Sequence, residues 1–226
     1  MKVVIFDSGA LITLSMNSLL DMLVDLRKVF KGKFVITKEV EEEIVKKPLT
    51  IKKYKLGAIR LRKLINDKIL EFPESLGVDS SEIRKISYDI IKQTNSIYFS
   101  KNYPVHIIDT GEASALALSK ILRAKKIDNV IAMDERTTRI LCEKPENLRE
   151  ILENKLHTRI EEKGQIDKDL QNTFFIRSTE LVYIAFKKGL IEDQSKDMLD
   201  ALLYSTKFKG ASISGSEIRE MERLNL

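Results

Sequence analysis

The sequence predicts an α/β fold in which a parallel central sheet is flanked by helices. Short apolar segments rich in β-branched residues alternate along the chain with segments of helical periodicity, the pattern typical of parallel sheets. The 226 residues contain no Gly/Ser-rich linker, internal repeat or low-complexity tract. We therefore expect a single domain over residues 1–226.

Five apolar segments are predicted strands. In chain order they read VVIF, FVI, VHII, VIAM and TFFIR, and they occupy residues 3–6, 34–36, 105–108, 130–133 and 173–177. Each is followed within a few residues by a helical segment, as the connections of a parallel sheet require.

Ten segments are predicted helices from the spacing of their apolar residues and from their capping and stop signals. They cover residues 9–30, 38–47 (ended by Pro48), 52–70, 80–98, 111–125, 135–143, 146–162, 179–188, 193–207 and 215–224. Two stretches look inserted into the core pattern. Residues 49–103 are helical and amphipathic without a clear strand, and residues 144–172 are polar and charged, so we expect both to form arms or lids.

Composition narrows the class of protein. Cys142 is the single cysteine, which excludes an intramolecular disulfide, and with only two histidines a structural zinc site is not expected. The apolar segment at 3–6 is too short for a signal peptide or a membrane span. We expect a cytoplasmic protein that does not enter a membrane.

Three aspartates stand at the ends of predicted strands. Asp7, Asp109 and Asp134 each follow an apolar segment at the point where it gives way to a helical one. The carboxyl ends of parallel strands meet at one edge of a sheet, and ligands bind at this edge. We therefore expect the three carboxylates to converge there.

Two glutamates are expected to join them. In FVITKEVEEEIVKKP, a strand, a Thr37 cap and about one and a half helical turns place Glu43 over the same edge. Glu112 lies one turn into the helix opened by DTGEASALALSKIL, on the same face as Asp109. For each of these acids taken singly, helix capping without a ligand is the alternative, because Asp109 with Glu112 fits a capping box and Asp134 fits an N-cap.

A cluster of this kind needs a cation. Two carboxylates about 5 Å apart repel by roughly 3 kcal/mol at an effective dielectric of about 20. The repulsion among four or five carboxylates exceeds the few kcal/mol of folding free energy that a domain can lose and stay folded. Ligands that are all oxygen favour Mg²⁺ or Mn²⁺ over zinc. Carboxylate-bound Mg²⁺ suits phosphodiester hydrolysis, because it lowers the pKa of the attacking water and neutralises phosphate charge.

The motifs in this order resemble those of the PIN-domain nucleases. VVIFDSGALI is similar to the family's opening strand and first aspartate, ITKEVEEEI to its second acidic motif, IIDTGEASALALS to its third and VIAMDERTTRIL to its fourth. FFIRSTELVYIAFKKGLI resembles the segment that closes many archaeal and bacterial members. The resemblance covers about residues 1–47 and 105–207.

The resemblance implies a metal-dependent endoribonuclease that is frequently a homodimer; small members are toxins paired with an antitoxin protein, although this chain is long for a toxin. The implied metal and catalytic residues are Asp7, Glu43, Asp109 and Asp134, with Glu112 as a further ligand or as the group that orients the attacking water. Some members carry adjacent aspartates at the fourth motif. Here Met133 precedes Asp134, so one of the two adjacent aspartates is missing, and Glu135 is the candidate substitute for it.

A basic segment is a candidate for contact with RNA, separate from the acidic residues. In IKKYKLGAIRLRKLI, the apolar residues Ile51, Tyr54, Ala58, Leu61 and Ile65 recur at helical spacing. The opposite face is a candidate for phosphate contacts, or else a solvated surface without a ligand. Its cationic residues are Lys52, Lys53, Lys55, Arg60, Arg62 and Lys63.

Two further residues and two alternative functions complete the interpretation of the sequence. His106, within an apolar segment, is expected to be a core histidine, and Ser178 is expected to cap the following helix. IFDSGAL is superficially similar to the opening of haloacid-dehalogenase phosphatases, but Gly9 stands where that mechanism needs an acid. The closer alternative is a PIN fold that binds RNA or assembles without catalysis.

Overall fold

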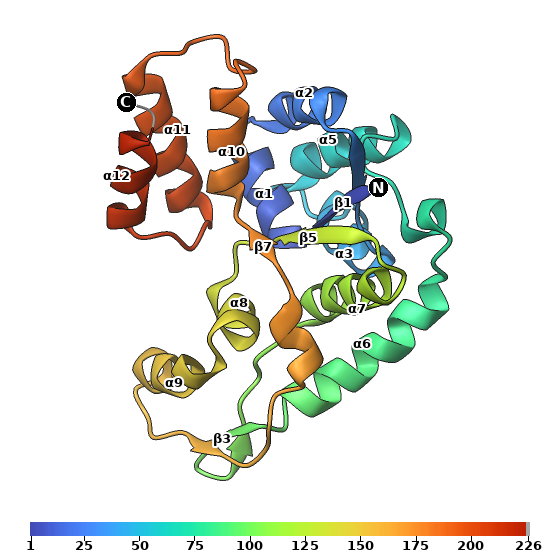
Figure 1. The fold of residues 1–226 in the computed structure, drawn as a ribbon, viewed down its shortest axis with the longest axis vertical. Helices are drawn as coiled ribbons and strands as arrows, with labels where there is room; N and C mark the ends of the chain where they lie inside the picture. Colours follow the sequence, from blue (N-terminus) through green and yellow to red (C-terminus); the bar gives the residue numbers. More distant parts are fainter. Residues whose placement is uncertain (225–226) are drawn as a thin grey trace.

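The computed structural model describes residues 1–224 as an α/β fold built on a four-stranded parallel sheet with the order β2-β1-β5-β7 (Figure 1). The sheet strands are β1 (Lys2–Phe6), β2 (Gly32–Val35), β5 (Asp128–Ala132) and β7 (Phe175–Ile176). Lys2 is in register with Gly32 on one side and with Asp128 on the other. The predicted fold class, a parallel sheet flanked by helices, is confirmed.

The sheet is covered on both faces because its strands are apolar on both faces. Val4 and Phe6 of β1 pack into a cluster formed mainly with α1, α2, α5 and α10. Val3 and Ile5 point to the opposite face, into a cluster formed mainly with α6 and α7. This explains why the strands read as short continuous apolar runs rather than as alternating patterns.

The helices follow the order of the sequence. Their bounds are α1 (Ser8–Met16), α2 (Leu20–Val29), α3 (Lys38–Glu41), the π-helical segment η1 (Glu42–Lys46), α4 (Lys47–Leu49), α5 (Lys55–Asn66), α6 (Ser80–Thr94), α7 (Thr110–Ala124), α8 (Arg136–Glu143), α9 (Leu148–Leu156), α10 (Ser178–Lys187), α11 (Lys196–Lys209) and α12 (Gly215–Arg223). Single 3₁₀ turns lie at η2 (Pro73–Leu76), η3 (Pro145–Asn147) and η4 (Lys168–Asn172).

The strand predicted at 105–108 is wrong. This segment is irregular in the structure, and β1 pairs directly with β5. The side chain of Asn95 replaces a neighbouring strand: its Oδ1 accepts hydrogen bonds from the backbone N–H groups of Ile107 at 2.7 Å and Ile108 at 3.0 Å. Its Nδ2 donates to the Ile108 carbonyl at 3.1 Å, so one amide side chain satisfies the backbone that a sheet would have paired.

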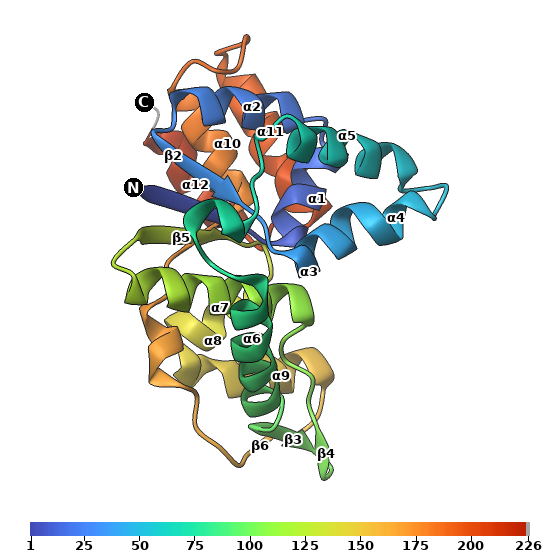
Figure 2. The ribbon, with the colours of Figure 1, turned by 90° about the vertical axis from the view of Figure 1, so that its right-hand side faces the viewer.

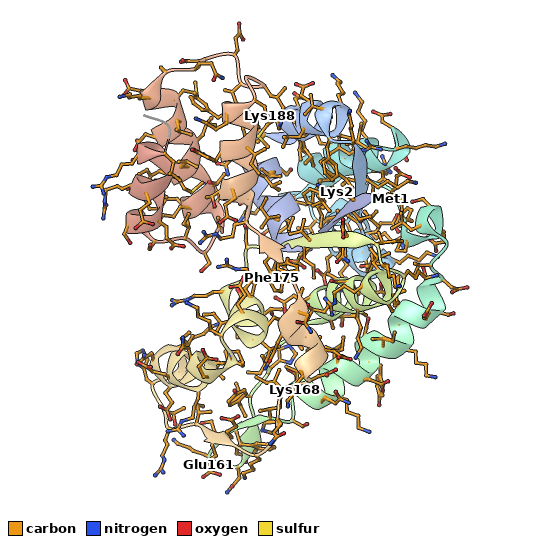
Figure 3. All side chains as sticks on the ribbon, viewed as in Figure 1. Met1, Lys2, Glu161, Lys168, Phe175 and Lys188 are labelled. Atoms are coloured by element: carbon orange, nitrogen blue, oxygen red, sulfur yellow. The ribbon has the colours of Figure 1, made fainter. Side chains whose placement is uncertain are left out.

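The expectation that all of 49–103 forms an arm or lid is wrong, because α5 and α6 pack against the core that covers the sheet, and only its last residues join the second insertion. The stretch 49–103, expected to lack strands, contributes β3 (Tyr98–Ser100) and the first residue of β4 (Tyr103–Pro104), and β3 pairs with β6 (Glu161–Glu162) from the second insertion. We call residues 97–107 and 144–166 the arm. In Figures 1 and 2 the arm lies on the side of the sheet opposite α2 and α10, and Figure 3 shows Glu161 far from Phe175.

The arm has its own apolar cluster, to which α8 also contributes. The cluster combines residues from both segments of the arm. Its buried members are Ile97, Tyr98, Ile107, Leu141, Leu148, Leu152 and Ile160.

Several predicted helices have different bounds. The segment 9–30 is two helices bent by 118°, with Ser18 at a φ of 58° between them. The segment 80–98 ends at Thr94 because its last residues enter β3. Pro48 does not end the helix at 47: the chain continues to Leu49, and the π-helical turn of η1 precedes the proline, whose nitrogen donates no hydrogen bond.

Within residues 1–224, no single helix is both long and apolar enough to cross a membrane. Helices α1 and α2 satisfy the length and composition criteria only when they are taken together across their 118° bend.

Asn95→Ala tests whether hydrogen bonds of the Asn95 side chain stabilise the irregular segment 105–108. The substitution leaves two buried backbone N–H groups without their acceptor, and we expect the free energy of unfolding in urea to fall by about 2–4 kcal/mol. Asn154→Ala, at an exposed position of α9, is the matched control and should change the free energy by less than about 0.5 kcal/mol. Equal effects of the two substitutions would contradict the proposed role of Asn95.

Candidate functional site

A cavity of about 390 Å³ opens at the carboxyl end of the sheet, between the sheet and the arm. Residues from the core form one side and residues from the arm form the other. The core side is lined by Asp7, Ser8, Gly9, Glu43, Asp109, Glu112, Glu135 and Thr137, and the arm side by Val105, His106, Ile107, Leu152, Lys155 and Leu156. Five carboxylates therefore share one cavity.

Asp7 occupies the junction between β1 and α1. Its backbone N–H donates to the Ala132 carbonyl at 3.0 Å, which extends the pairing of β1 with β5 by one residue. Its Oδ2 caps α1 by accepting from the Gly9 N–H at 3.1 Å. The residue is only 3% exposed, and its Oδ1 has no hydrogen-bond partner among the described residues.

The environment of Asp7 disfavours its charge. The pKa of this carboxyl is raised to about 7, mainly by burial and also by the charges of Glu43 and Asp134. The backbone N–H groups of Gly9 and Ser8 act in the opposite direction. A buried, unpartnered carboxylate oxygen that faces a cavity is unusual in a folded protein, because such groups normally find a hydrogen-bond partner.

Glu43 reaches the cavity from the π-helical segment η1. Thr37 starts the preceding helix as predicted, since its hydroxyl accepts from the Val40 N–H at 3.2 Å. The carboxylate of Glu43 lies against Gly111 at the start of α7, where an added Cβ would stand 2.6 Å from its Oε2. The missing side chain of Gly111 is what allows this approach.

Glu112 and Asp109 form the predicted capping pair at the start of α7. Glu112 Oε2 accepts from the Asp109 N–H at 3.0 Å. Burial raises the pKa of Glu112 to about 8, and the charges of Asp7 and Glu135 contribute in the same direction. Asp109 is exposed, and its Oδ1 lies 2.7 Å from His106 Nε2.

The expectation for His106 is wrong. Its side chain is 65% exposed and lines the cavity, because the segment 105–108 is not a buried strand.

Asp134 is buried beside the cavity but does not line it. Its Oδ1 accepts from the Ser178 N–H and its Oδ2 from the Ser178 hydroxyl, both at 2.8 Å. Asp134 therefore ties the end of β5 to the start of α10. It is not the N-cap of α8, a role taken by Glu135, whose Oε1 accepts from the Thr137 N–H at 3.1 Å.

Lys155 is a lining residue that sequence reasoning missed. Its Nζ lies 3.9 Å from Glu135 Oε1, at the limit of an ion pair. Nothing in the local sequence marks this lysine, because it stands among other charged residues of an insertion and reaches the cavity only through the folding of the arm.

The structure brings four of the five predicted site residues to the cavity lining, and Glu135 joins them. In the described part of the chain, no three His, Cys, Asp or Glu side chains stand close enough to form a ready-made metal site. The lining carboxylates are nevertheless all oxygen donors, which are the ligands that Mg²⁺ and Mn²⁺ prefer. The assignment of Asp134 as a direct ligand stays a prediction.

The basic face lies away from the cavity. Its six cationic residues are exposed on and just before α5, they do not line the cavity, and no ion pair within residues 1–224 engages them. Ala58 and Leu61 are buried as the periodicity predicts, whereas Ile51 and Tyr54 are exposed. Contact of this face with RNA stays a prediction.

No protein-family model, curated protein or solved structure matches this chain. The functional inference therefore rests on the cavity and its residues.

The raised pKa values of Asp7 and Glu112 predict a pH-dependent stability of the metal-free protein. Between about pH 4 and pH 8 the folded state holds protons that the unfolded state releases, so stability falls as pH rises through this window. We expect the free energy of unfolding in EDTA to decrease by an amount on the order of 3 kcal/mol from pH 5 to pH 8.

Asp7→Asn should remove roughly half of this decrease, because an asparagine oxygen still caps α1 but never ionises, while Glu112 keeps its own share. The matched control is Asp89→Asn, at an exposed position of α6, and it should follow the wild-type curve. A wild-type protein whose stability does not fall with pH would show that burial of Asp7 is not costly.

Proposed function

We propose that this protein is a metal-dependent ribonuclease of the PIN type, which hydrolyses RNA phosphodiester bonds with metal-activated water. The observation that carries the proposal is the Oδ1 atom of Asp7, a buried and unpartnered carboxylate oxygen at a cavity that four further carboxylates line. The cavity lies at the carboxyl end of the sheet, where ligands of parallel α/β folds bind.

A bound cation would resolve the electrostatic conflict in this cavity. Burial is the main cause of the raised pKa values of Asp7 and Glu112, and the charges of neighbouring acids act in the same direction. No cation of the chain pairs closely with either carboxyl group within residues 1–224. The residues fit a hard divalent ion, because they offer carboxylate oxygens and little else.

Asp7, Glu43 and Glu112 are the proposed holders of Mg²⁺ or Mn²⁺, with Asp109 and Glu135 at the rim. When bound, such an ion lowers the pKa of a coordinated water and neutralises charge on the phosphate. The acidic side chains could not perform this role alone, since their own charge repels a phosphodiester.

The remaining groups position these ligands. One oxygen of Glu112 accepts a hydrogen bond from the Asp109 N–H, which holds this carboxyl group at the cavity that it lines, where it would orient the attacking water. Asp134, anchored by Ser178, supports the turn that carries Asp7: a Cβ added at Gly9 would lie 3.2 Å from Asp7 Oδ2 and 4.0 Å from the Asp134 Cβ. We propose Asp134 mainly as a positioning residue.

A catalytically weak module that binds RNA is the second candidate. Two observations favour it: the described residues hold no ready-made group of three metal-ligating side chains, and Met133 is buried in the core, so it supplies no second acid beside Asp134. A homodimer and an antitoxin partner are expected from the family resemblance alone, and a cytoplasmic location is expected from the composition; all three stay predictions.

Cleavage of a mixed-sequence single-stranded RNA tests the ribonuclease. We expect the wild type to cut it with Mn²⁺ or Mg²⁺ and not with EDTA, and Asp7→Asn to reduce the rate by at least about 100-fold, because removal of a charged ligand weakens both metal binding and catalysis. Product analysis on denaturing gels provides the measurement.

Asp89→Asn serves again as the control and should cut at the wild-type rate. A folded wild type that binds RNA but never cuts it would favour the binding module, and equal activity of Asp7→Asn would exclude Asp7 as a ligand.

Gly111→Ala tests the position of Glu43. The added Cβ displaces the flexible end of Glu43 rather than the backbone, so the free energy of unfolding should change by less than about 1 kcal/mol while the cleavage rate falls by about tenfold or more. Gly164→Ala is the matched control, since its added Cβ makes only an ordinary contact with Ile97 at 3.4 Å. Full activity of Gly111→Ala would show that the approach of Glu43 to α7 is dispensable.

A further inference from the structure

The arm gives the cavity a second wall whose chemistry is opposite to that of the carboxylates. Val105, Ile107, Leu152 and Leu156 make this wall aliphatic, and Lys155 adds a positive charge to it. Leu156 is 44% exposed, although it is a large apolar residue that packs into no buried cluster of the described residues. An exposed apolar surface that faces a cavity is a typical ligand contact.

Two backbone N–H groups and the imidazole ring of this wall are already engaged. The Val105 N–H donates to the Tyr98 carbonyl at 2.8 Å, and the Ile107 N–H donates to Asn95 Oδ1. The ring nitrogens of His106 lie within hydrogen-bonding distance of Asp109 and Asn95. These groups are therefore not available for hydrogen bonds with the edge of a nucleobase.

Lys155 differs from these groups because its charge is available. Its side chain is 61% exposed, and its pairing with Glu135 at 3.9 Å is too long for a good hydrogen bond. A phosphate that enters the cavity competes easily for this ammonium group, since exposed pairs of this kind contribute little stability.

We infer that the arm wall is a subsite for one nucleotide of a single-stranded RNA, with the base packed on Val105 and Leu156 and an adjacent phosphate held by Lys155. The inference rests on the proposed function, whose substrate it specifies. The cavity of about 390 Å³ lies within the size range of pockets that hold small molecules.

Two properties of the substrate follow. The base must leave its stack to reach an aliphatic wall inside a cavity, so a duplex is excluded. The wall lacks free hydrogen-bond donors of the kind that distinguish bases, so the subsite accepts purines and pyrimidines alike.

The test measures binding without cleavage. A fluorescein-labelled hexanucleotide of mixed-sequence RNA is titrated with protein in EDTA, and fluorescence anisotropy gives Kd at several salt concentrations. The variants are Lys155→Ala, Lys155→Arg and Leu156→Ser, all at exposed positions, with Lys144→Ala as the control at an exposed arm position outside the cavity lining.

We expect Lys155→Ala to raise Kd about fivefold to tenfold and to reduce the salt slope by about 0.7, because one phosphate contact is lost. Leu156→Ser should raise Kd about threefold or more through lost contact with the base, whereas Lys155→Arg and Lys144→Ala should bind like the wild type. A hairpin duplex should bind at least about tenfold more weakly than the single strand, and homopolymers should differ by less than about threefold.

This pattern supports the subsite even if the wild type cuts no RNA, in which case only the proposed nuclease activity fails. Unchanged binding by Lys155→Ala and Leu156→Ser overturns the subsite even if the wild type is an active nuclease. Equal binding of duplex and single strand, a strong preference for one base, or no binding of RNA by the wild type also overturns it.

Discussion

The architecture of the site depends on a single buried carboxylate, that of Asp7. Its backbone is fixed by β5, and one of its oxygens caps α1, so neither the sheet nor the helix can shift without moving it. Its other oxygen is unpartnered and its pKa is raised to about 7 by burial. A fold that keeps such a group loses stability at neutral pH, and functional sites are where this loss is ordinarily retained.

The arm turns an acidic sheet edge into a cavity with two chemically different walls. Sheet pairing between β3 and β6 joins segments that lie about 60 residues apart in the sequence, and their shared apolar cluster holds α9 beside the carboxylates. The carboxylates then face aliphatic groups and one ammonium across a space of about 390 Å³. Under the proposed function, this division suits a nucleotide, which has a charged phosphate and a base whose flat faces pack on apolar side chains.

Local signals in the sequence predicted much of the framework. The apolar runs of β1, β2 and β5 were identifiable because buried parallel strands are continuous in hydrophobicity. The caps at Thr37 and at Asp109 with Glu112 were identifiable because a cap involves residues within one helical turn. From these, the general rule for parallel sheets placed Asp7, Glu112 and their neighbours at one edge without knowledge of any long-range contact.

The sequence by itself therefore determined the fold class, the strand ends and most of the acidic lining, all of which follow from interactions between near neighbours in the chain. Only the tertiary structure decided that 105–108 is irregular, because an apolar run does not reveal whether a strand or the Asn95 side chain pairs its backbone. It also decided that Asp134 faces Ser178 and that Lys155 lines the cavity. These outcomes depend on contacts between distant residues, which local periodicity and capping patterns do not encode.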